Sequence, residues 1–314
     1  FLSLGYGRLG NFTRQLELGK QSLVISEEMD DQRRMTKAMS VIAMAYFNLG
    51  NFESSLQFQL KVLKIRESAK DYKGLVGSYN NLGIVYQRLN QPEDAIDSYQ
   101  KALEYLVAGK SEQIRGAILN NLGSLYSHTG KNLEAIGLLN QALALHEVTG
   151  NREGLSLTHN NLGIALSTLN RDNDAMFHYL KALKLNEEGG DKHGMAVTAM
   201  NLGSLHQKTG NQSEAIRYFE YSLKLSLEEG FRDIEMNSYV NLAVFHENMG
   251  NYRKAYEYHT RYTSLKDSLF TEETSGNMNK MRAMYEADRK EQDNILLNQK
   301  LAFRELQLSR RQTT

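Results

Sequence analysis

A period of forty residues is the feature that most constrains the fold of this chain. The letters "NNLG" begin at positions 80, 120 and 160, and altered copies begin at 200 ("MNLG") and 240 ("VNLA"). Two-residue turn signals that start with Gly or Asn keep the same phase, beginning at 10, 50, 90, 130, 170, 210 and 250. Such self-similarity predicts a stack of small repeated units, in which neighbouring units together form the core.

Each unit reads as two helices joined by a tight turn. A Gly or Asn at the first turn position suits the left-handed residue that ends a helix. A second series with the same period consists of residue types that cap helix N-termini: Asp31, Asp71, Ser111, Asn151 and Asp191. For one unit we predict helix A over about 72–89 and helix B over about 92–108. Pro92 falls in the first turn of helix B, where its missing N–H costs nothing.

The apolar spacing predicts how the two helices of a unit pack. One face of helix A carries Tyr79, Leu82, Gly83 and Tyr86. The answering face of helix B carries Ala95, Tyr99 and Ala102. The small residue of helix A recurs as Gly123, Gly163 and Gly203. We expect it to let helix B approach closely, as an antiparallel helix pair requires.

These residues resemble the tetratricopeptide repeat family. The residues that carry the resemblance are Leu82, Gly83, Tyr86, Ala95, Tyr99 and Ala102, with their copies. The forty-residue unit is longer than the family's usual one and resembles a subgroup found in kinesin light chains, Pins-type adaptors and bacterial signalling proteins. The resemblance implies an all-α, right-handed superhelical solenoid whose helices A line a concave groove. We expect the array to span 1–269, with a partial first repeat over 1–29 and six full repeats over 32–269.

The period disappears in the last segment, 270–314. A heptad-like seam over 278–311, half of it polar, favours two interpretations equally: a capping helix, or a connector that forms a homodimeric coiled coil. The sequence of this segment also resembles the segment that follows the repeats in Bacteroidetes-type sensor proteins. There, a transmembrane helix and a histidine kinase or DNA-binding domain come next. That resemblance implies a periplasmic array; otherwise a cytoplasmic one is expected.

Composition and motifs exclude several classes of function. Lys plus Arg and Asp plus Glu both number 37, which argues against nucleic acid as a partner. The chain has no cysteine and no apolar run long enough to span a membrane. "GYGRLG" at 5–10 lies in a repeat helix, so it does not indicate a dinucleotide site. His206 and His246 occupy the Tyr86 position and are expected to pack rather than bind metal. We therefore expect no catalytic cluster, cofactor or metal, and no enzyme.

The asparagines are the best candidates for function. A second stripe of helix A cannot share the core face, and in the family this stripe lines the groove. Its asparagines form one series with the period of the repeat: Asn81, Asn121, Asn161, Asn201 and Asn241. An amide both donates and accepts, as recognition of a peptide backbone requires. The same stripe carries Ile84 and Ile164, and it carries Arg88, His128 and Lys208 on one rim.

Two interpretations of this series stay open. It binds a protein or peptide ligand in the groove, or each amide bonds the neighbouring repeat and fixes the stacking. The preceding asparagines, Asn80, Asn120 and Asn160, lie a further 100° round the helix and are assigned to stacking, pointing away from the groove. The chain is thus predicted to be a non-enzymatic peptide-binding scaffold that forms the sensory or interaction region of a larger signalling protein. The alternative is a structural spacer that dimerises ahead of a membrane or output domain.

Overall fold

The computed structural model describes residues 11–106 and 112–269, and every regular element in these ranges is an α-helix. The helices are α2 (Phe12–Glu28), α3 (Gln32–Asn48), α4 (Phe52–Ser68), α5 (Tyr72–Arg88), α6 (Pro92–Tyr105), α7 (Glu112–His128), α8 (Asn132–Thr149), α9 (Arg152–Thr168), α10 (Asp172–Gly189), α11 (Lys192–Lys208), α12 (Gln212–Glu229) and α13 (Arg232–Asn248). A last helix covers 252–269. The contacts divide the chain into two compact units, 1–231 and 232–314, which are described separately.

The predicted turn and cap residues define the helix ends. Asp31, Asp71, Asn151 and Asp191 each accept the backbone N–H three residues further on, as N-caps do. The predicted turn residues of the described chain all have positive φ: Gly50, Asn90, Gly130, Asn170, Gly210 and Gly250. Helix α6 ends three residues before the predicted 108, because Leu106 is extended, with ψ 102°. Ser111 lies outside the described residues.

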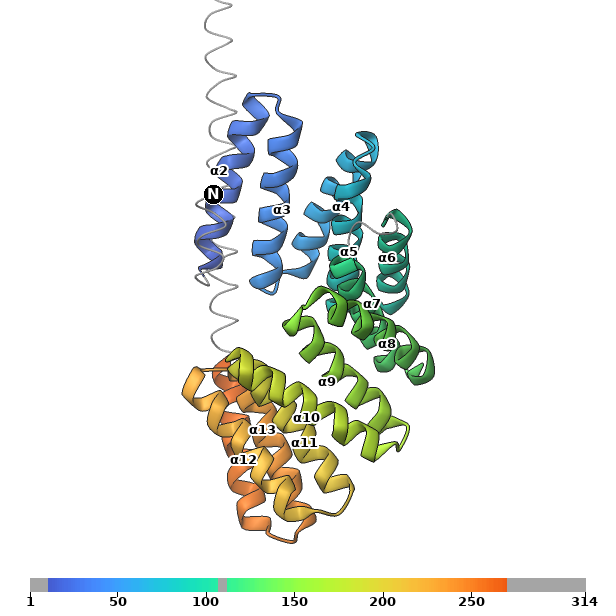
Figure 1. Ribbon diagram of the computed structural model, residues 1–314. Coiled ribbons are helices and arrows are strands. Elements are labelled where there is room, and N and C mark those ends of the chain that lie inside the picture. The colour runs from blue at the N-terminus through green and yellow to red at the C-terminus, as the bar shows by residue number, and fades with distance from the viewer. Residues whose placement is uncertain (1–10, 107–111, 270–314) are drawn as a thin grey trace, which may run out of the picture. The chain divides into compact units, whose positions relative to one another are not determined.

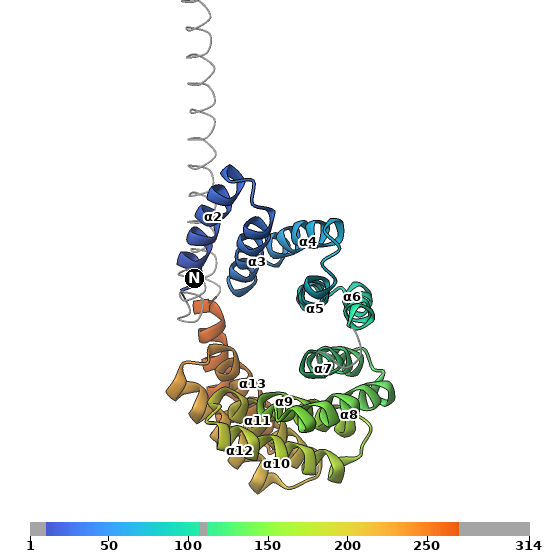
Figure 2. The ribbon, with the colours of Figure 1, turned by 45° about the horizontal axis from the view of Figure 1, so that its top comes forward.

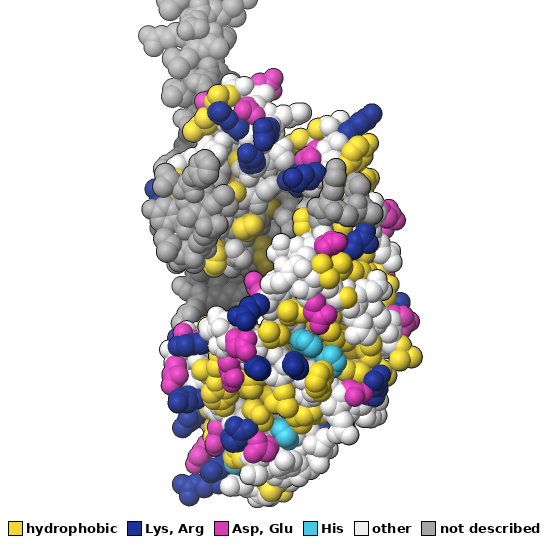
Figure 3. All heavy atoms as spheres, viewed as in Figure 1, with side chains coloured by type: hydrophobic (Ala, Val, Ile, Leu, Met, Phe, Trp, Pro, Cys, Tyr) yellow, Lys and Arg dark blue, Asp and Glu magenta, His cyan; other side chains and the backbone are white. Residues whose placement is uncertain are grey.

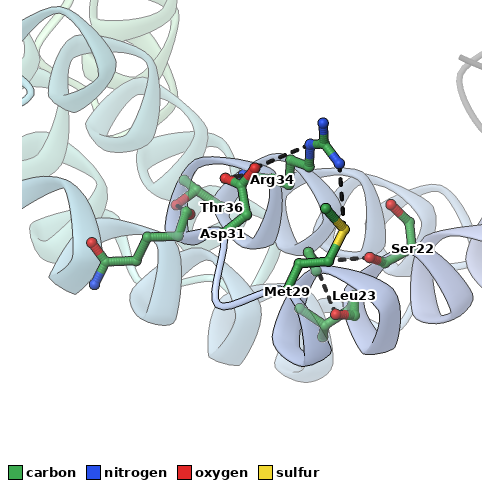
Figure 4. A network of polar contacts seen from close by, with 8 residues as sticks. Ser22, Leu23, Met29, Asp31, Arg34 and Thr36 are labelled. Atoms are coloured by element: carbon green, nitrogen blue, oxygen red, sulfur yellow. Dashed lines mark hydrogen bonds and ion pairs between the residues drawn. The ribbon is translucent and has the colours of Figure 1, made fainter.

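The link between α2 and α3 shows how one junction is closed (Figure 4). Asp31 caps α3 by accepting the Arg34 N–H at 2.9 Å. The Arg34 guanidinium returns to the Asp31 carboxylate at 3.0 Å and to the sulfur of Met29 at 3.5 Å. The arginine therefore joins the end of one helix to the start of the next.

Glycines set the close approach within each pair. A Cβ added to Gly83 would lie 2.5 Å from Cε1 of Tyr99, and one added to Gly163 would lie 2.5 Å from Cε1 of Tyr179. Both tyrosines are buried. The ring of helix B thus occupies the space that a side chain on helix A would need, as the sequence predicted.

Polar contacts join α4 to α5 and α8 to α9, at a position that the sequence did not reveal. Near the end of α4, Nη1 of Arg66 donates to Ser78 Oγ at 2.6 Å and to the Gly74 carbonyl at 2.7 Å, both on α5. Near the end of α8, the amide of Asn151 lies 3.2 Å from Nδ1 of buried His146. Because the Asn151 oxygen already accepts the Gly154 N–H, its nitrogen faces the ring, and His146 Nδ1 must accept.

The helix pairs of the first unit stack side by side (Figures 1 and 2). In Figure 2 the A helices α3, α5 and α7 lie on the inner side of the curved row, and the B helices α4, α6 and α8 lie on the outer side. Apolar contacts cross from one pair to the next: Leu82 and Tyr99 share one core cluster with Leu122 of the next pair. The predicted all-α solenoid is confirmed, and its predicted long C-terminal helix lies outside the described residues.

The second unit, as far as it is described, consists of α13 and the helix over 252–269. His246 is 5 % exposed and stacks on Tyr258 with the ring centroids 5.6 Å apart. In the first unit, His206 stacks in the same way on Tyr218 at 5.5 Å. Both histidines therefore pack against helix B aromatics, as predicted.

Candidate functional site

The two series of asparagines form one hydrogen-bonded ladder along the A helices. Asn121 donates through Nδ2 to Oδ1 of Asn80, 3.3 Å away in the preceding pair. Asn161 donates in the same way to Asn120 at 3.1 Å, and Asn201 donates to Asn160 at 2.9 Å. Asn120 is 8 % exposed, and its Oδ1 also accepts from Thr158 Oγ1 at 3.1 Å. Each rung therefore ties a helix A to the helix A forty residues earlier.

This ladder corrects the separate roles that the sequence indicated for the two series. The first asparagine of each pair does serve stacking, but its partner is the second asparagine of the next pair. The second asparagine is half-buried in each case and donates through Nδ2 to a rung: Asn121, Asn161 and Asn201. Within the described residues, their Oδ1 atoms have no hydrogen-bond partner. Each rung thus leaves one acceptor for a ligand while holding the stack together.

The two ends of the series differ from its middle. Asn81 is half-buried on α5, and its side chain makes no hydrogen bond to any described residue. Position 40, which by the spacing of the rungs would be the acceptor for Asn81, is a serine whose hydroxyl donates to the Thr36 carbonyl. Asn241 is half-buried on α13, in the other unit. The series is therefore not five equivalent sites, although the spacing is the same throughout.

A cleft of about 530 Å³ opens where α5, α6 and α7 meet, and it brings four of the predicted site residues together. These four are Ile84, Arg88, Asn121 and His128. The remaining lining residues are Gln87, Asn90, Pro92, Tyr99, Leu125 and Thr129. We call this site the α5–α7 cleft. Its volume lies within the range of ordinary ligand pockets, about 300–1,000 Å³.

The walls of the α5–α7 cleft combine an apolar base with a polar rim. Ile84 is half-buried and packs against the core, and Leu125 and Tyr99 belong to the same core cluster. Burial raises the pKa of Tyr99 far above its usual range, so its hydroxyl keeps its proton and donates to Oε1 of Gln87 at 3.3 Å. The base is thus fixed by packing, and the rim provides the adaptable groups.

Two cationic or polar side chains stand at the rim. Arg88 is exposed, and no described carboxylate pairs with it. His128 is exposed too, and its Nδ1 lies 2.8 Å from the Ser124 carbonyl. A carbonyl can only accept, so Nδ1 carries a proton and Nε2 remains for a ligand. The rim can therefore bind an acceptor or an anionic group of a ligand.

The expectation that Lys208 contributes positive charge to an open rim is corrected by its ion pair. Its Nζ donates to Asp172 Oδ1 at 2.7 Å and to the Ser167 carbonyl at 2.6 Å. It therefore bridges α11 to the end of α9 and the start of α10. Its charge is neutralised within the repeat stack.

The same bridge is missing at the α5–α7 cleft. The forty-residue period maps Lys208 onto His128 and Asp172 onto Pro92. Neither a proline nor an imidazole held to Ser124 can form that ion pair. The only proline of the chain therefore lies at a junction that lacks this ion pair.

Ile164, the last predicted site residue, is half-buried on α9 and packs against the neighbouring core cluster. It lies outside the α5–α7 cleft, as do Asn81, Asn161, Asn201 and Asn241. Among the described residues, no helix is long and apolar enough to cross a membrane.

Sequence patterns of known families match most of the repeats. A tetratricopeptide repeat pattern matches residues 34–106 and 115–188. Two further patterns of the same repeat match 197–228 and 238–269. Together they cover more than half of the chain. A comparison with curated proteins finds no match.

Solved structures share the fold at low sequence identity. A Signal Transduction ATPase with Numerous Domains protein with a tetratricopeptide repeat sensor, from Pyrococcus horikoshii, is 19% identical with a TM-score of 0.66, over 86% of this chain and 42% of that one. PilF of Pseudomonas aeruginosa is 20% identical with a TM-score of 0.53, over 74% and 93%. Aspartyl phosphate phosphatase F of Bacillus subtilis is 13% identical with a TM-score of 0.58, over 77% and 74%. This chain spans less than half of the Pyrococcus protein. At these identities the likeness shows the fold alone.

Proposed function

Because this chain belongs to the tetratricopeptide repeat family, whose fold is generally a non-catalytic interaction scaffold, we propose that it binds a peptide segment of a protein partner in the α5–α7 cleft. The observation that carries the proposal is the opening of this cleft where Pro92 and His128 replace the Asp172–Lys208 bridge. The asparagine ladder is assigned a double role, in stacking and in ligand binding.

The chemistry of the cleft suits an extended peptide with one apolar side chain. Asn121 offers a free amide oxygen to a backbone N–H, and Arg88 offers donors to a carbonyl or carboxylate. The apolar base of Ile84 and Leu125 provides a site for the apolar side chain. A ligand held in this way could bind without any change in the packing of the repeats.

A designed closure tests the proposal. The double variant Pro92→Asp/His128→Lys copies the bridge that Lys208 makes with Asp172. Asp is well tolerated in the first turn of a helix, so the variant should remain folded. Peptides selected from a random display library on the wild-type chain should bind this variant at least about ten-fold more weakly, a loss of about 1.4 kcal/mol.

A second variant separates loss of binding from loss of stability. Arg88→Ala removes a rim side chain that has no described ion-pair partner, so stability should change by less than about 0.5 kcal/mol. The selected peptides should nevertheless lose affinity for it. If the library yields no binder, or if the binders ignore both variants, the α5–α7 cleft is not the site.

A sensory role within a larger signalling protein is a second candidate. It is favoured by the similar Pyrococcus protein, in which such repeats are described as a sensor within a longer chain. The segment 270–314 would then be the connector, forming a homodimer through 278–311. Sedimentation of the full chain and of a chain ending at 271 tests this. If both chains sediment as monomers, the dimeric connector is ruled out, and with it the dimerising spacer.

A further inference from the structure

The outer face of α8 is not used by the proposed function, and no residue of this helix lines the α5–α7 cleft. The inner side of α8 is fully buried at Leu139 and Ala142. Its outer side, which lies on the outside of the curved row in Figure 2, carries Leu133 near one end and Val148 near the other. These side chains are 72 % and 76 % exposed. A helix that is apolar on both sides is normally buried on both sides, and a single chain covers only one side of α8.

The outer face of α8 also lacks the charges that the other B helices carry. Charged side chains of both signs are spread over the face of the molecule drawn in Figure 3. The forty-residue period defines six outward positions, and α4, α6, α10 and α12 have three or four charged residues at them. In α8 all six are exposed and uncharged: Leu133, Gly137, Asn140, Gln141, Ala144 and Val148. Depletion of charge around exposed apolar side chains indicates a protein contact rather than a solvated surface.

The six positions repeat the same pattern from either end of α8. A large apolar residue is followed at a spacing of four by a small residue, and then at a spacing of three by an amide: Leu133, Gly137 and Asn140 in one direction, and Val148, Ala144 and Gln141 in the other. A twofold contact presents the same patch on both sides, so a face with this symmetry is complementary to an antiparallel copy of itself. We propose that two copies of this chain form a homodimer through their α8 outer faces, about a twofold axis between Asn140 and Gln141.

The antiparallel pairing brings matching groups together. Leu133 of one copy lies at the level of Val148 of the second copy, and Gly137 lies at the level of Ala144. The small residues let the two helices approach to about 8 Å between their axes. Asn140 lies beside its own counterpart near the twofold axis, and a side-chain amide can both donate to and accept from an identical amide.

The charges at the edges of this face do not oppose the pairing. Glu134 and Glu147 are the only acidic or basic residues of α8 apart from His146, which is buried. Glu134 follows Leu133 and Glu147 precedes Val148, so they lie on opposite sides of the face and remain on opposite sides of the seam in the dimer. Because one helix from each copy makes a small interface, we expect a weak dimer that forms in the micromolar range.

Sedimentation equilibrium of the full chain tests this contact, and the wild type should show a reversible dimer. Ala144→Lys introduces the lysine that α4, α10 and α12 carry at this outward position, so the variant should fold. A long charged side chain in place of a small residue should weaken the dimer at least about ten-fold. Leu60→Gln is the matched control, because it removes an exposed apolar side chain from α4 and copies Gln100 of α6. It should leave the dimer unchanged.

Single cysteines test the register, because the chain has no cysteine of its own. Asn140→Cys should form a disulfide-linked dimer on oxidation, since the two copies of this residue lie only about 1.5 Å apart along the helix axis. The two copies of Leu133 lie about 22 Å apart in the same direction. Leu133→Cys should therefore not cross-link with itself, but it should cross-link when mixed with Val148→Cys.

Two sedimentation results would overturn the α8 contact. One is a wild type that stays monomeric throughout the micromolar range. The other is a dimer that Ala144→Lys leaves unchanged, which is the result expected if dimerisation occurs only through 278–311. Cross-linking of Leu133→Cys with itself as readily as Asn140→Cys would overturn the antiparallel arrangement.

Discussion

Replacing Gly163 by alanine tests the close packing of helix α9 on helix α10. The new Cβ would meet three atoms of the Tyr179 ring, Cε1, Cδ1 and Cζ, at 2.5, 2.6 and 2.9 Å. Carbon atoms pack comfortably at about 3.5–4.0 Å, so the ring or its helix must move by about 1 Å. Tyr179 is 4 % exposed and has no free space to turn into.

The expected loss follows from two opposing effects. Alanine is a better helix former than glycine by about 1 kcal/mol. Overpacking in a close-packed core costs about 1–3 kcal/mol, and a contact this short belongs in the upper part of that range. Gly163→Ala should therefore lower the free energy of unfolding by about 1–2 kcal/mol.

Gly137→Ala is the matched control. Gly137 is an exposed glycine inside α8, and a Cβ there would meet nothing within 4 Å. This variant should gain about 1 kcal/mol. Urea unfolding followed by far-ultraviolet circular dichroism compares the two. If Gly163→Ala proved as stable as Gly137→Ala, close approach would not be what the glycine provides.

Two further predictions concern stability. Burial lowers the pKa of His146, so below a pH of about 6.5 the folded chain binds fewer protons than the unfolded chain, and stability is lost as the pH falls. His146→Leu, which copies Leu106, should reduce this loss when urea unfolding is measured at several pH values; an unchanged pH dependence would contradict the assignment. Asn120→Ala removes the acceptor of one buried donor, Thr158 Oγ1, and of the half-buried Asn161 amide, and should cost about 1–3 kcal/mol, whereas Asn81→Ala, whose side chain has no described partner, should change stability by less than about 0.5 kcal/mol. Equal losses for the two would contradict the ladder.

The sequence predicted the fold well because its signals are local and repeated. A left-handed Asn90, an N-cap at Asp71 and the spacing around Gly83 each act within one helix pair. The period then extends each inference to the other repeats. The early end of α6 was missed, because the apolar pattern continues past Leu106 while the backbone leaves the helix there.

The site was predicted only in part, because its contacts cross between repeats. The spacing put Arg88 and Asn121 on the same stripe of two successive repeats, but it could not show that the amide of Asn121 bonds Asn80. Lys208 looked like a free cation for the same reason, since its partner Asp172 lies on another helix. Comparing equivalent positions in successive repeats would have been the usable signal. Lys208 lies two repeats after His128, and the period places Asp172 opposite Lys208 but Pro92 opposite His128. Only the first of these pairs can form an ion pair.

The affinity of a library-selected peptide for the wild type and for Pro92→Asp/His128→Lys is the measurement that tests the central claim most directly. Isothermal titration with both proteins, alongside urea unfolding to show that both are folded, gives the two dissociation constants. Binding in the α5–α7 cleft predicts at least about ten-fold weaker affinity for the closed variant at unchanged stability. Equal affinity for the two proteins would contradict it.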